Sequence, residues 1–69
     1  MEELYPNVRE EVKEVAQVAW NLALMQRNPS KIAKFLHSVT EYYSHLYTEE
    51  EIEFLRFYFN MKMEMEKNE

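Results

Sequence analysis

The tripeptide Asn28-Pro29-Ser30 divides this chain, because a proline disfavours the α-helical conformation in the residue before it. On both sides of the tripeptide the sequence has no glycine and is rich in helix-forming residues. Asn28 can end one helix in the left-handed conformation and cap the next, of which Pro29 is the first residue. We therefore expect one helix to stop near Arg27 and another to begin at Pro29.

Two capping boxes mark the starts of the other helices. Asn7 is followed three residues later by Glu10, and Thr48 by Glu51, the spacing at which two residues satisfy each other's backbone N–H groups. The sequence therefore predicts an all-α fold, a three-helix bundle with short connections. We expect a single domain over residues 1–69, with helices over residues 7–27, 29–46 and 48–66.

Composition excludes several kinds of protein. The absence of cysteine excludes disulfides and thiolate metal sites and agrees with the cytoplasm, where we expect the protein to reside. The net charge of −5 makes nucleic acid and anionic membranes unfavourable partners, because binding to phosphate needs clustered Lys and Arg. The longest apolar-rich stretch, residues 18–25, is too short to cross a bilayer, and we expect neither a secretory signal nor a membrane span.

The apolar residues of the middle helix gather on one side, as they do in a helix that packs against a core. An arc of roughly 180° holds Ile32, Phe35, Leu36, Val39, Tyr42, Tyr43 and Leu46. We expect this face to be buried within the domain.

The first helix is apolar over more than one face. Apolar residues recur alternately four and three positions apart, the spacing of a seam along which helices pack: Val8, Val12, Val15, Ala19 and Leu22. Ala16 and Ala23 lie beside this seam and allow another helix to approach closely. Trp20 and Leu24 project away from it, so that the second half of this helix has more apolar surface than one packing contact can cover.

The last helix has a similar surplus of apolar surface. Its polar residues form one narrow stripe of Glu53, Arg56, Asn60, Glu64 and Lys67. The remaining arc of roughly 200° is almost entirely apolar, and only one side of it can pack on the middle helix. We expect an interaction surface formed by Trp20, Leu24, Phe54, Phe57, Met61 and Met65.

Three arrangements account for this surplus. We favour a homodimer in which the first and last helices of two copies complete a shared core. A docking surface for a different protein is the second arrangement, and Met61, Met63 and Met65 suit it because methionine adapts to irregular partners. The third is a compact monomer that leaves some Tyr and Met side chains exposed.

One group of residues has the composition of a metal site. His37, Glu41 and His45 recur every four residues on the polar side of the middle helix, and imidazole and carboxylate groups bind zinc. His37 and His45 would lie about 12 Å apart along the helix axis, so that one ion could reach only two of the three side chains. We therefore expect a solvated polar face, with no metal and no cofactor.

The sequence indicates no catalytic chemistry. It has no cysteine nucleophile and no glycine with which to build a phosphate-binding loop, so we expect no enzyme.

The segment Thr48-Glu49-Glu50-Glu51-Ile52 resembles the start of a recognition helix in helix-turn-helix proteins, but its acidic residues would repel DNA phosphates. We expect a non-enzymatic, homodimeric regulatory or adaptor protein that acts by protein–protein contact. The alternatives are a structural subunit of a larger complex and a degenerate helix-turn-helix DNA-binding regulator.

Overall fold

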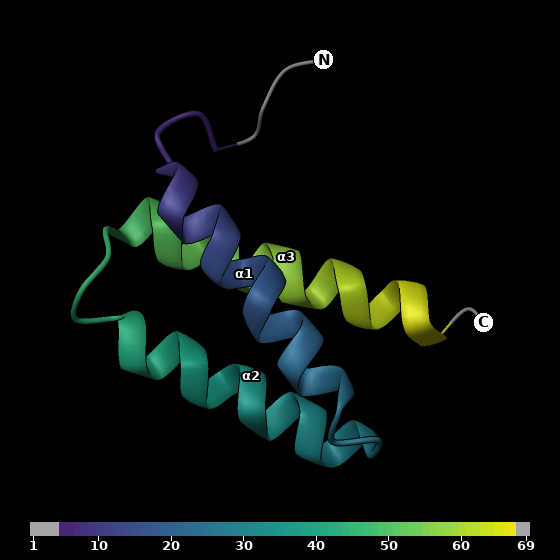
Figure 1. Cartoon of the computed structure of the whole chain (residues 1–69). Helices are drawn as coiled ribbons and strands as arrows, with labels where there is room; N and C mark the ends of the chain where they lie inside the picture. The colour runs from purple at the N-terminus through teal and green to yellow at the C-terminus, as the bar shows by residue number, and fades with distance from the viewer. Residues whose placement is uncertain (1–4, 68–69) are drawn as a thin grey trace.

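Three helices make up the fold of this chain. The computed structural model describes residues 5–67, with α1 at Glu10–Leu24, α2 at Pro29–Tyr43 and α3 at Glu49–Lys67. Helices α2 and α3 run side by side in opposite directions, and α1 lies diagonally across both (Figure 1). The molecule is flat as a result, with principal extents of 32 × 29 × 15 Å. The predicted all-α, three-helix architecture is confirmed.

None of the three helices, over the part of the chain that the structure describes, combines the length and the apolar character that crossing a bilayer requires.

Helix α2 begins at Pro29 as the sequence predicts, whereas α1 ends at Leu24, three residues before the expected end at Arg27. Asn28 caps α2, because its side-chain Oδ1 accepts hydrogen bonds from the backbone N–H groups of Ser30 (2.9 Å) and Lys31 (3.2 Å). The left-handed residue is Arg27, with φ of 56°, and not Asn28 as expected. Asn28 must be extended to cap α2, so the reversal of the chain falls on the residue before it.

The start of α1 differs from the prediction. The helix begins at Glu10, and its N-cap is Arg9, so the expected capping box between Asn7 and Glu10 is wrong. The backbone N–H of Asn7 donates to Glu50 Oε2 at 3.0 Å, and that of Arg9 donates to Glu51 Oε2 at 3.1 Å. Carboxylates from the start of α3 thus take the place of a local cap.

The capping box at the start of α3 is confirmed. The backbone N–H of Thr48 donates to Glu51 Oε1 at 3.1 Å, and the backbone N–H of Glu51 donates to Thr48 Oγ1 at 3.2 Å. The Glu51 carboxylate also accepts two hydrogen bonds from the guanidinium of Arg9, at 2.8 and 3.0 Å. Through these hydrogen bonds Glu51 joins the starts of α1 and α3. Its side chain is only 1% exposed, so this junction lies inside the molecule.

An aromatic contact extends this junction to the loop between α2 and α3. The Arg9 guanidinium lies 5.4 Å from the ring centroid of Tyr47, a cation–π distance. The Tyr47 ring stacks on that of Tyr43 at 4.7 Å, so that all three helices meet at this end of the molecule.

The core is centred on a strip of small residues along α1. The buried apolar side chains are Val8, Val12, Ala16, Ala19, Trp20, Ala23, Leu36, Ile52, Leu55 and Phe59. Alanines at positions 16, 19 and 23 let α1 lie close to both α2 and α3. Of the expected packing seam, Val8, Val12 and Ala19 are buried, whereas Val15 is half-buried and Leu22 is 48% exposed. The axis of the core therefore runs along the alanines.

Helix α2 buries less of its apolar face than expected. Its buried residues are Leu36 and Thr40, whereas Tyr42 is 67% exposed. Leu46, which was expected to extend this face, follows the end of the helix and is 60% exposed. Because α1 lies across only part of α2, the expectation of a fully buried α2 face is wrong.

Replacement of Glu51 tests the junction between α1 and α3. Glu51→Gln removes the charge that Arg9 and two backbone N–H groups contact, so we expect the free energy of unfolding to fall by about 2 kcal/mol. Urea denaturation at neutral pH measures this change. Glu53→Gln, on the exposed side of the same helix, should change stability by less than about 0.5 kcal/mol. Equal effects of the two substitutions would contradict the role of Glu51.

The same junction predicts a dependence of stability on pH. Hydrogen bonds from Arg9 lower the pKa of the Glu51 carboxyl from its ordinary value of 4.5 to about 2. The stabilisation is therefore complete above pH 4.5 and is lost as the pH falls from 4.5 towards 2. Denaturation at a series of pH values should show a larger loss in the wild type than in Glu51→Gln. Parallel pH profiles would rule this contribution out.

Candidate interaction site

An apolar groove lies between α1 and α2. Its apolar side chains, which we call the α1–α2 surface, are Val15, Val18, Leu22, Phe35, Val39 and Tyr43, around a volume of about 290 Å³. Glu14 and Ala19 complete the lining. Val18 is 56% exposed and Leu22 48%, so these side chains are presented to solvent and not to the core. Apolar exposure of this kind on adjacent helices is typical of a protein-binding surface.

The groove arises from the way in which α1 and α2 meet. Val15, Val18 and Leu22 recur at intervals of three and four residues, on the side of α1 that borders the groove with α2. Phe35 and Val39 occupy the corresponding side of α2 and are half-buried. The small Ala19 between the two rows leaves the groove open.

A second exposed apolar row lies on α3. Phe57, Met61 and Met65, which we call the α3 stripe, are 40%, 39% and 57% exposed. They follow one another at intervals of four residues and therefore share one side of the helix. The ring of Tyr5 packs against Phe57, with centroids 5.7 Å apart, so one end of the α3 stripe is partly covered by the chain itself.

The six residues expected at an interface lie in different environments. Trp20 is 6% exposed and belongs to the core, so the expectation that it projects away from the packing seam is wrong. The core is centred on the alanine strip, and Trp20 lies beside this strip within the core. Leu24 is partly exposed beside Trp20, in a hollow that Ile32 and Met63 also line. Phe54 is half-buried against Tyr5, and Phe57, Met61 and Met65 form the α3 stripe.

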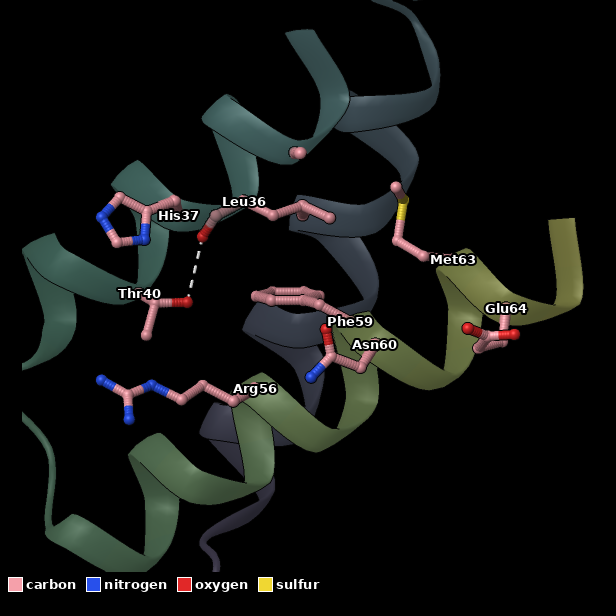
Figure 2. Close-up of a pocket in the computed structure, with 9 residues that line it drawn as sticks. Leu36, His37, Thr40, Arg56, Phe59, Asn60, Met63 and Glu64 are labelled. Atoms are coloured by element: carbon pink, nitrogen blue, oxygen red, sulfur yellow. Dashed lines mark hydrogen bonds between the residues drawn. The ribbon is translucent and has the colours of Figure 1, made fainter. Parts of the chain in front are cut away.

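A larger pocket of about 500 Å³ lies between α2 and α3, on the side away from α1. Figure 2 shows Leu36 and Phe59 facing each other across its floor, with Arg56 and His37 towards one end and Glu64 towards the other. The Thr40 hydroxyl is engaged, because it donates to the backbone oxygen of Leu36 at 3.0 Å. These floor residues are already buried, so a ligand would gain little apolar contact there.

The candidate metal ligands do not come together. His37 Nε2 lies 4.0 Å from Glu41 Oε2, and both side chains are exposed. Helix α2 ends at Tyr43, so His45 does not continue their row. Within residues 5–67, no three His, Cys, Asp or Glu side chains are grouped as metal binding requires.

The acidic start of α3 has a structural role. Of the three glutamates at 49–51, Glu50 accepts a hydrogen bond from Asn7 and Glu51 from Arg9. Glu49 and Glu53 remain exposed in the first turns of the helix, where a recognition helix would carry base-contacting side chains. The surface at this junction is therefore acidic, which is unfavourable for contact with DNA phosphates.

Comparisons with protein-family models, curated proteins and solved structures give no match to this chain.

Replacement of Trp20 separates a core role from a role in assembly. We expect Trp20→Ala to lower the free energy of unfolding by about 3–5 kcal/mol, because it opens a cavity in the core. Thermal or chemical denaturation at the lowest workable concentration measures this loss without a contribution from assembly. Met25→Ala, which replaces a 74% exposed side chain, is the control and should have little effect. Wild-type stability in Trp20→Ala would show that the indole contributes nothing to the core.

Proposed function

We propose that this protein acts by protein–protein contact, as a small acidic, non-enzymatic regulatory or adaptor protein that forms a homodimer. The observation that carries this proposal is the exposure of large apolar side chains on two separate surfaces, the α1–α2 surface and the α3 stripe. Contiguous apolar surface costs free energy in water, and a partner that covers it recovers that free energy.

The shape of the molecule supports a role in binding. A flat arrangement of three helices offers broad faces to a partner. Helices that present apolar side chains every three or four residues commonly contact other helices. The side chains involved are aliphatic, aromatic and methionine residues, which are well suited to packing and poorly suited to proton transfer.

The size of the chain also favours an assembled form. A domain of 69 residues buries a smaller fraction of its surface than a larger one, and here neither disulfides nor cysteine-bound metal can add stability. Association with a second copy would supply the missing burial. A homodimer is therefore favoured over a monomer that binds a different protein, and over a structural subunit of a larger complex.

The mass of the protein in solution tests the homodimer. We expect sedimentation equilibrium to give twice the 8.5 kDa mass of the chain at high micromolar concentration and a decrease towards 8.5 kDa on dilution. The melting temperature should rise with concentration over the same range, because dimerisation stabilises the folded state by mass action. A mass of 8.5 kDa and a constant melting temperature at every concentration would contradict the homodimer.

A further inference from the structure

We propose that two copies of this chain associate through the α1–α2 surface around a two-fold axis, with Glu14 of each copy opposite Lys31 of the other. This inference rests on the proposed function and identifies the partner of the α1–α2 surface as a second copy. It follows from the distribution of apolar and charged residues along α1 and α2.

The centre of the α1–α2 surface is apolar. Val18 and Leu22 on α1 and Phe35 and Val39 on α2 line the groove together. Along each helix these pairs are four residues apart, so they form two short parallel ridges with a furrow between them. The ridges of a second copy can enter such a furrow, as they do in other helix–helix contacts.

The two ends of this surface carry opposite charges. Helices α1 and α2 run in roughly opposite directions, with a short connection at 25–28 (Figure 1). Glu14 lies one turn before Val18 and lines the groove beside Tyr43. Lys31 is not among the side chains that line the groove, but it lies one turn before Phe35, towards the opposite end, where α1 finishes. The surface is therefore acidic at the start of α1 and basic at the start of α2.

A two-fold axis that lies in the interface, perpendicular to the line from Glu14 to Lys31, makes the charges complementary. Rotation by a half turn places the acidic end of one copy on the basic end of the other, and the resulting pair of contacts is identical on both sides. Glu14 and Lys31 are both exposed, and neither side chain forms an ion pair among residues 5–67. Both charges are therefore available to a partner and can fix the orientation of the two copies.

The α3 stripe lacks this complementarity. Glu53 lies one turn before Phe57, and at the other end Glu64 and Lys62 flank Met61 and Met65 on opposite sides. An antiparallel pairing of two such stripes would bring Glu53 of one copy near both a glutamate and a lysine of the other, so the charges favour no particular orientation. Tyr5 already contacts Phe57, so less of this surface is open. A second copy is therefore accommodated better on the α1–α2 surface.

Charge reversal tests the predicted pairing. Glu14→Lys and Lys31→Glu each place like charges in contact twice per dimer, so each should raise the dimer dissociation constant roughly tenfold at low salt. The double variant restores opposite charges and should return the constant to near the wild-type value. Sedimentation equilibrium or light scattering at several concentrations measures all four proteins, and circular dichroism checks that each remains helical.

A matched control makes the same change of charge outside the proposed contact. Glu53→Lys alters the net charge as Glu14→Lys does, but on α3, and should leave the dissociation constant unchanged or lower it slightly. Val18→Ser with Leu22→Ser should abolish the dimer, whereas Phe57→Ser with Met61→Ser should leave it intact.

The possible outcomes distinguish this inference from the function on which it rests. A wild-type protein that stays monomeric contradicts both. A wild-type dimer that is insensitive to Glu14→Lys and Lys31→Glu but dissociates in Phe57→Ser with Met61→Ser contradicts the α1–α2 contact alone. Loss of the dimer in both single reversals without recovery in the double variant contradicts the pairing of Glu14 with Lys31.

Discussion

The Glu51 carboxylate holds together the end of the molecule at which α1 and α3 begin. It accepts hydrogen bonds from the guanidinium and the backbone N–H of Arg9 and from the backbone N–H of Thr48. A buried carboxylate is costly unless its oxygens are satisfied, and here both oxygens accept hydrogen bonds, from Thr48 three residues away and from Arg9 42 residues away in sequence. The position of α1 across α3 depends on this contact because α1 has no side-chain cap of its own.

Small residues then determine what the rest of α1 can do. Ala16, Ala19 and Ala23 bring the helix close to its two neighbours, and Trp20 fills the space beside them. A close approach along one strip leaves the flanking side chains, such as Val18 and Leu22, outside the core. The compact packing of the strip and the exposure of the α1–α2 surface thus have the same origin.

Much of the helical framework could be predicted from the sequence, because Asn28, Pro29 and the pair Thr48 and Glu51 act on neighbouring residues. The link between Arg9 and Glu51 could not, because nothing local indicates which distant donor a glutamate will meet. Surface assignments failed for a related reason. A helical wheel shows that Trp20 and Val18 lie on different sides of α1, but the placement of α3 decides which side is buried. The exposure of Tyr42 likewise depends on how far α1 extends along α2.

Helix α2 buries few of its side chains, and this has a consequence for the motions of the molecule. Only Leu36 and Thr40 of this helix are buried, whereas α1 contributes much of the core. Partial openings of a protein begin in the elements with the least burial, so α2 should separate from α1 and α3 at a lower free energy than global unfolding requires. Any molecule that binds along the groove between α1 and α2 would oppose this opening. Amide exchange in α2 would then report whether the groove is occupied.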